Sequence, residues 1–211
     1  MRRPILLALS LAPLVAQAPA VPQPAPSALE KAVVLELSEA RWRPKVYAKY
    51  LKALRDRFEG NLWNLPDQVP LRTQEGVAAV DEAIAFLEQT EAPGPLRFNP
   101  GLWRAARELA QDQGANGGVG HRGSRGSQLR ERIGRQGSGA MAYGECIAYG
   151  FDEPRMIALQ LIIDDGVPDR GHRKSIFNPD FHHAGAALAN HPLWGFVCVV
   201  DFADGFTPNK R

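Results

Sequence analysis

The chain has 211 residues, of which 45% are apolar and 23% charged, so it can form a globular domain with a substantial core. Lysine and arginine number 25 against 23 aspartate and glutamate, and the balance becomes even without the two arginines of residues 1–20. A net charge near zero gives no electrostatic case for binding nucleic acid or anionic membranes. We therefore expect no nucleic-acid partner.

The first twenty residues have the pattern of a secretory signal peptide. A basic start with Arg2 and Arg3 precedes an apolar run over 5–15, which is too short to span a bilayer. Ala18-Pro19-Ala20 then fits a cleavage site. The pattern predicts a secreted or periplasmic protein with no transmembrane anchor after cleavage, and the alternative is an uncleaved N-terminal anchor. Residues 21–26 are rich in proline and alanine and are predicted to form a tether.

Helices are predicted through most of the N-terminal half. Ser27 and Glu30 have the spacing of a capping box, which predicts a helix start. Asn99-Pro100 combines a good N-cap with proline at the first helical position. Two further stretches carry apolar residues at helical spacing. They are Tyr47, Tyr50, Leu51, Leu54 and Phe58, and Val77, Val80, Ile84 and Leu87. Residues 60–72 are expected to be irregular.

The C-terminal half changes character. Residues 114–126 are glycine-rich and predict a loop, after which a short helix should end before Gly137. Residues 144–150 are expected to turn into a strand, and a further helix should open at 152–154. Residues 184–189 and 194–202 favour two β-strands. Helices followed by antiparallel strands predict an α+β fold in which helices cover a small sheet.

Two histidines and nearby carboxylates are the candidate functional groups. His121 and His172 are both flanked by glycine, and Glu145 lies between glycine-bounded turns. Asp164 and Asp165 close an apolar helix. Brought together, such groups could bind a divalent metal such as Zn²⁺, Mg²⁺ or Ca²⁺, or transfer protons near neutral pH. The alternative is that they only hydrogen-bond the loop backbones.

The remaining residues give weaker indications. Cys146 and Cys198 could form a disulfide in an exported protein, or could be two buried free thiols. His182, His183 and His191 lie beside expected strands and turns, where a lone polar residue is usually solvated. The glycine-rich loop has no phosphate-binding ending, and the chain's serines there lack the spacing of a nucleophile elbow.

Four segments, in this order, resemble the CAP superfamily of cysteine-rich secretory, antigen 5 and pathogenesis-related proteins, in its bacterial secreted form. The similarity covers about residues 27–206, which leaves 207–211 as a tail. The segments are Leu37-Ser38-Glu39-Ala40-Arg41, residues 95–102 with Ala105-Ala106, Gly120-His121-Arg122-Gly123-Ser124 with residues 144–148, and residues 171–179 with Gly185.

The resemblance implies a three-layer α-β-α sandwich, with a small antiparallel sheet between helices and a wide cleft. It also implies that His121, Glu145 and His172 converge in the cleft, as candidate catalytic or metal-binding residues. An acid on the preceding helix should join them, either Asp164 or Asp165.

The chain departs from the family pattern in three places. Ser38 stands where asparagine or histidine is usual, and Cys146 follows Glu145 in place of asparagine. Residues 44–93 are expected to be a helical insertion that covers or extends the cleft.

Three functions follow as hypotheses, because members of the family are associated with several activities. The first is a secreted binding protein for a small hydrophobic or cell-envelope ligand, with or without a divalent metal. The second is a metal-dependent hydrolase that uses His121, His172 and Glu145. The third is a protein–protein interaction module whose partner surface is the insertion.

Overall fold

The computed structural model describes residues 24–66 and 69–210. The expected signal peptide and residues 21–23 of the expected tether lie outside these ranges. Among the helices described, none is both long enough and apolar enough to cross a lipid bilayer.

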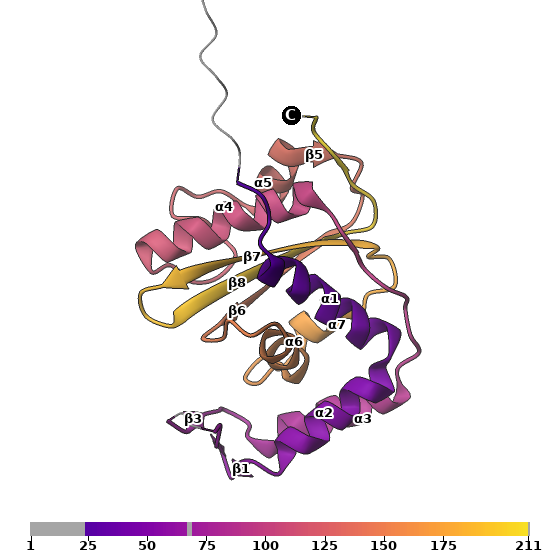
Figure 1. Ribbon diagram of the computed structural model, residues 1–211, viewed down its shortest axis with the longest axis vertical. Helices are drawn as coiled ribbons and strands as arrows, with labels where there is room; N and C mark the ends of the chain where they lie inside the picture. Colours follow the sequence, from indigo (N-terminus) through magenta and orange to yellow (C-terminus); the bar gives the residue numbers. More distant parts are fainter. Residues whose placement is uncertain (1–23, 67–68, 211) are drawn as a thin grey trace, which may run out of the picture.

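A four-stranded sheet forms the middle layer of the molecule (Figure 1). Its strand order is β4-β7-β8-β6, with β4 at Arg97–Phe98, β7 at His183–His191, β8 at Gly195–Ala203 and β6 at Tyr143–Tyr149. The three longer strands pair antiparallel, as expected, whereas the two-residue edge strand β4 runs parallel to β7. Strand β6 is the opposite edge, and this edge carries the candidate site.

Helices cover both faces of the sheet, as the α-β-α expectation requires (Figure 1). One face packs against α4 (Pro100–Asn116), which is followed by α5 (Leu129–Gln136). The other face is covered by α1 (Ala28–Trp42), α6 (Pro154–Ile163) and α7 (Gly171–Ile176). Because β8 is covered on both sides, its residues 197–203 are all buried, with no polar–apolar alternation.

Local sequence signals account for the helix starts. The Ser27 hydroxyl accepts the Glu30 backbone N–H, and the Glu30 carboxylate accepts the Ser27 backbone N–H. These two bonds form the predicted capping box. The Asn99 side chain accepts from two backbone N–H groups of α4, and Pro100 occupies the first position. Gly185 lets α4 approach the sheet closely, because a Cβ atom at this position would lie 2.0 Å from the backbone nitrogen of Trp103.

The insertion is only partly helical, which corrects the sequence-based prediction. Helices α2 (Pro44–Arg55) and α3 (Val77–Gln89) pack on each other and against α1 and α6. Between them, strands β1 (Phe58–Glu59), β2 (Leu62–Trp63) and β3 (Leu71–Arg72) form a small antiparallel sheet. A strand of two residues is too short to show the alternation of apolar and polar residues by which strands are predicted from sequence.

The expected tail also contains a strand. Residues Thr207–Pro208 form β9, which pairs antiparallel with β5 at Gly137–Ser138. The pairing ties the end of the described chain to the end of α5.

Candidate functional site

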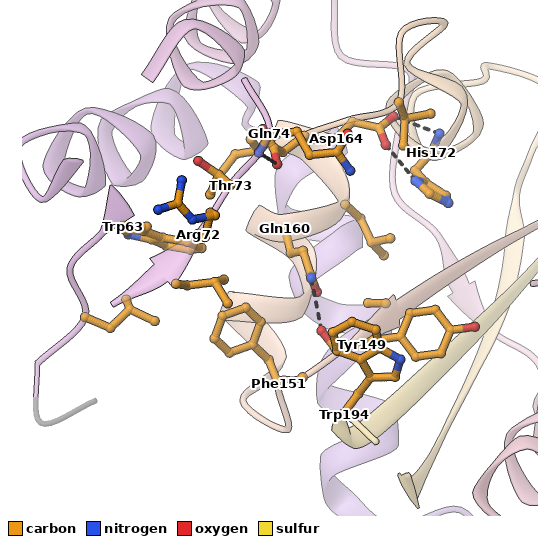
Figure 2. A pocket seen from close by; sticks show the side chains of 18 of the residues that line it. Trp63, Arg72, Thr73, Gln74, Tyr149, Phe151, Gln160, Asp164, His172 and Trp194 are labelled. Carbon is orange, nitrogen blue, oxygen red and sulfur yellow. Dashed lines mark hydrogen bonds and ion pairs between the residues drawn. The ribbon is translucent and has the colours of Figure 1, made fainter. Parts of the chain in front are cut away.

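A cavity of about 740 Å³ lies between the insertion and the β6 edge of the sandwich. Figure 2 shows Trp63 and Arg72 of the insertion on one side, and Tyr149, Trp194 and His172 on the other. The insertion therefore forms one wall of this cavity. Most of the lining is apolar. The apolar and aromatic lining residues are Phe58, Trp63, Leu65, Val69, Leu71, Val119, Ile147, Ala148, Tyr149, Phe151, Leu161, Ile163, Val167, Leu193 and Trp194.

Aromatic contacts join the insertion to the sandwich. The Trp63 ring stacks on Phe58 with centroids 5.5 Å apart, and it meets the edge of Phe151 at 5.9 Å. Trp63 comes from the small sheet, whereas Phe151 follows strand β6. Such aromatic pairs add to the free energy gained from burying their area, so they help to fix the cavity wall.

Charged groups hold the insertion to the end of α6. The Asp165 carboxylate accepts the backbone N–H groups of Gln74 and Glu75, at 2.7 and 2.8 Å. In return, Glu75 accepts from the Gly166 backbone and pairs with Arg170 at 2.7 Å. The Arg170 guanidinium and the Gly166 N–H lower the pKa of Glu75 to about 2. We call these five residues, Gln74, Glu75, Asp165, Gly166 and Arg170, the latch.

Asp164 is the carboxylate that contacts His172. Its Oδ1 lies 2.6 Å from His172 Nδ1, and its Oδ2 accepts the backbone N–H groups of His172 and Arg173. Asp164 adopts the left-handed conformation that ends α6, which turns its side chain back toward α7. Of the two acids that the sequence left open, Asp164 is therefore the one beside His172, whereas the candidate Asp165 binds the insertion instead.

His121 pairs with Glu145 on the other face of strand β6. His121 Nδ1 lies 2.9 Å from Glu145 Oε1, and the His121 side chain is 59% exposed. Arg132 of α5 is fully buried and donates to Glu145 Oε2 at 2.6 Å. Arg132 also donates to the carbonyl oxygens of His121 and Ser127, so one guanidinium holds the carboxylate and the glycine-rich loop together.

A second carboxyl group lies against this cluster. Asp201 is directly opposite Glu145 across strands β6 and β8, and it is fully buried. Neither of its side-chain oxygens has a hydrogen-bond partner among the described residues, and the same is true of Arg132 Nε. Burial raises the pKa of Asp201 well above its usual range, and the neighbouring Glu145 charge raises it further.

The two histidines thus form two pairs instead of one ligand set. The alternation of β6 directs Glu145 toward α5, whereas the Cys146 sulfur lies 3.7 Å from the His172 carbonyl on the opposite face. Among residues 24–66 and 69–210, no three His, Cys, Asp or Glu side chains are grouped so that they could hold a metal ion. The side chains as placed therefore do not fit the metal site predicted on His121, Glu145 and His172.

Other predicted residues support the scaffold. Arg41 is buried and donates to four backbone carbonyl groups, those of Gly94, Ile176, Asn178 and Phe181, which fixes the chain after α7. The Ser38 hydroxyl accepts the Leu96 N–H at 3.0 Å, so it joins α1 to the segment before α4.

The two cysteines are free and buried, which decides between the two alternatives left by the sequence. Burial raises the pKa of both thiols, so neither is suited to act as a nucleophile.

Three residues that hold or border the candidate site escaped the sequence reasoning. Arg132 is one of several arginines on a short helix, and no motif marks it. Asp201 had a signal, because a carboxylate within the apolar run of β8 is unusual. His191, expected to be solvated, is buried and bonds Gly118 together with the N–H groups of Leu193 and Trp194. It thereby fixes the hairpin tip at the mouth of the cavity.

Comparison with known proteins gives a family and two similar structures. No curated protein matches the chain. An outer surface protein from Borrelia burgdorferi matches with a TM-score of 0.43 and 21% identity, over 51% of this chain and 76% of that one. An extracellular protein containing an SCP domain, from Bacillus anthracis, matches with a TM-score of 0.43 and 21% identity, over 57% of this chain and 37% of that one.

The sequence model of the CAP family, described as the cysteine-rich secretory protein family, matches residues 90–202. This match spans nearly all of the four-stranded sheet, α4 to α7 and both histidine–carboxylate pairs, and it begins just after α3, so the helices and strands of the insertion lie outside it. Because it covers more than half of the 211 residues, the chain belongs to the CAP family.

Proposed function

We propose that this CAP-family protein is an exported binding protein whose cavity takes up a small, mostly apolar ligand. The observation that carries the proposal is the cavity of about 740 Å³ with aromatic walls from both the insertion and the sandwich. Small-molecule sites are typically concave, largely apolar and about 300–1,000 Å³ in volume. A cell-envelope lipid has the matching chemistry.

The exposed apolar residues support the same function. Ten large apolar side chains are exposed in the described part of the chain, and half of them line the cavity. These five are Val69, Leu71, Val119, Leu193 and Trp194. Single exposed apolar residues are common on protein surfaces and carry no functional meaning. Several of them gathered at the mouth of a cavity are typical of a binding site. An apolar ligand would remove part of this surface from water.

Export rests on the N-terminal pattern. Residues 1–20 have the features of a secretory signal peptide, with a basic start, a short apolar run and a small-residue cleavage site. Delivery outside the cytoplasm would give the cavity access to envelope lipids.

Replacing Trp194 with serine tests the proposal. Calorimetric titration with lipids and cell-wall fragments should detect a ligand of the wild-type protein, and Trp194→Ser should bind it about tenfold more weakly, because a large apolar contact is lost. Trp42→Ser is the matched control, since Trp42 is equally exposed but lies outside the cavity. Absence of binding across the panel, or equal weakening by both substitutions, would contradict the proposal.

The other two hypotheses remain predictions. A metal-dependent hydrolase would need His121, Glu145 and His172 to gather around one ion, and the described side chains form two separate pairs. Calorimetry with Zn²⁺, Mg²⁺ and Ca²⁺ on the wild type and on His121→Ala with His172→Ala tests it. An interaction module would need a free insertion surface, whereas several apolar residues of the insertion face the cavity.

A further inference from the structure

The Gln160 side chain supplies the cavity wall with an unused hydrogen-bond acceptor. Its Nε2 donates to the Tyr149 carbonyl oxygen at 3.0 Å (Figure 2). Only the nitrogen of a side-chain amide can donate a hydrogen bond. The bond to the Tyr149 carbonyl oxygen therefore assigns the positions of the amide nitrogen and the amide oxygen. Oε1 is then the remaining acceptor, and it is buried without a partner among the described residues. An unmade hydrogen bond at such an atom is costly, and a ligand donor would relieve the cost.

His172 supplies a second acceptor in the lining of the same cavity. A carboxylate only accepts hydrogen bonds, so the contact of 2.6 Å between Asp164 Oδ1 and His172 Nδ1 requires the imidazole to donate from Nδ1. In its neutral form the ring then presents Nε2 as an acceptor. The His172 side chain lines the cavity and is 23% exposed, so a ligand can reach it.

From these two groups we infer that the cavity selects ligands with a hydrogen-bond donor at the polar end, which means an alcohol or an amide and not a carboxylate. The inference rests on the proposed function and specifies its ligand class. Asp164 and Asp165 also line the cavity, and their negative charges disfavour a carboxylate near the two acceptors.

Arg72 is a cationic residue of the cavity lining, and its charge would favour a ligand with a carboxylate. It is exposed on the insertion side of the cavity, across from His172 (Figure 2). Ion pairs made by exposed arginines contribute little, because water screens them. A donor that reaches the Gln160 oxygen gains more, because that acceptor has no partner among the described residues and its hydrogen bond is otherwise unmade. The balance therefore favours the alcohol and the amide.

Three ten-carbon probes test the inference on the unaltered protein: decanol, decanamide and decanoate. Calorimetric titration should give dissociation constants for decanol and decanamide about tenfold lower than for decanoate. If decanoate binds as tightly as decanol, or more tightly, the inference fails and the proposed binding function stands. If none of the three probes binds, the binding function fails, and the inference fails with it.

A substitution assigns the selection to Gln160. In Gln160→Met, which keeps the length and the apolar stem but has no amide, decanol should lose its advantage and bind within about threefold of decanoate. Gln111→Met is the matched control, at an exposed position of α4 outside the cavity, and should retain the tenfold preference. Circular dichroism establishes that each variant is folded. If the preference for decanol persists in Gln160→Met, the selection does not depend on Gln160. If that variant does not fold, the comparison of the three probes on the wild-type protein still decides the ligand class.

Discussion

The two histidine–carboxylate pairs share their residue types but differ in what surrounds the carboxylate. Glu145 is held by the buried Arg132 guanidinium and lies opposite the buried Asp201, and its histidine is mostly exposed. Asp164 is held by two backbone N–H groups, and its histidine lines the cavity. The first pair therefore depends on one ion pair in the protein interior, whereas the second depends on the turn that ends α6.

The difference shows that two histidine–carboxylate pairs can be held in place in different ways, one by a buried ion pair and the other by backbone hydrogen bonds. A buried ion pair is costly to break, because either partner left alone is an unpaired charge in the interior. A carboxylate held by backbone N–H groups keeps those bonds for as long as the turn keeps its shape. We therefore assign the His121 pair mainly to the stability of the glycine-rich loop and α5, and the His172 pair to the cavity.

Loss of the buried guanidinium should have the largest effect. Arg132→Met leaves Glu145 without its cationic partner and removes the donor of the His121 and Ser127 carbonyl groups. We expect the free energy of unfolding, measured by urea denaturation, to fall by about 3–5 kcal/mol. Arg135→Met on the same helix is the control, since its exposed pair with Glu108 should contribute less than about 1 kcal/mol. Similar losses in both variants would contradict the assignment.

Neutralising the other carboxylate should have an intermediate effect and a distinct spectroscopic consequence. In Asp164→Asn, the amide oxygen can still accept the two backbone N–H groups, but the amide nitrogen then faces His172 Nδ1. We expect a loss of about 1.5–3 kcal/mol in stability, and a neutral imidazole that carries its proton on Nε2.

Nitrogen NMR of the labelled imidazole reports that change of tautomer directly. The preference for decanol over decanoate should weaken in parallel, because His172 would present a donor to the cavity. An unchanged tautomer in Asp164→Asn would show that Asp164 does not orient the ring.

Acid should open the latch. Because the pKa of Glu75 is lowered to about 2 in the folded protein, its contribution is complete above its usual pKa near 4.5 and is lost as the pH falls toward 2. Hydrogen exchange at residues 72–76 should therefore accelerate across this window, after correction for the intrinsic rate.

Glu75→Gln removes the titrating group. Its exchange at the same residues should depend less on pH between 4.5 and 2 than that of the wild type, whereas Glu91→Gln, an exposed position outside the latch, should behave as the wild type. Equal pH dependence in Glu75→Gln would place the acid sensitivity elsewhere.

The smallest effect is expected at the exposed histidine. His121→Ala removes the bond to Glu145, but Arg132 still holds that carboxylate. The free energy of unfolding should change by less than about 1 kcal/mol. A loss as large as that of Arg132→Met would mean that His121, and not the guanidinium, maintains the cluster.

Local chemistry allowed much of the fold to be predicted from sequence. The capping box at Ser27, the Asn99-Pro100 helix start and the glycine after α5 are each decided by neighbouring residues. The similarity to the CAP family supplied the layer order, which periodicity alone could not. The two-residue strands of the insertion escaped because their pairing is decided by tertiary contacts, such as that between Trp63 and Phe151.

The candidate site could be predicted in its residues but not in its pairing. His121, Glu145, His172 and an acid after α6 were all identified from sequence. Their separation into two pairs depends on which face of β6 each residue meets, and on the left-handed turn at Asp164. The contribution of Arg132 could not be predicted, because burial distinguishes it from the other arginines of α5 and sequence does not reveal burial.

The most direct measurement is mass spectrometry of the small molecules that accompany the native protein on purification, combined with elemental analysis. We expect an apolar molecule with a hydroxyl or amide group, retained by the wild type and by Trp42→Ser and reduced in Trp194→Ser, with no stoichiometric metal. A stoichiometric divalent metal without an organic ligand, lost in His121→Ala and His172→Ala, would contradict the proposed binding function and favour the hydrolase.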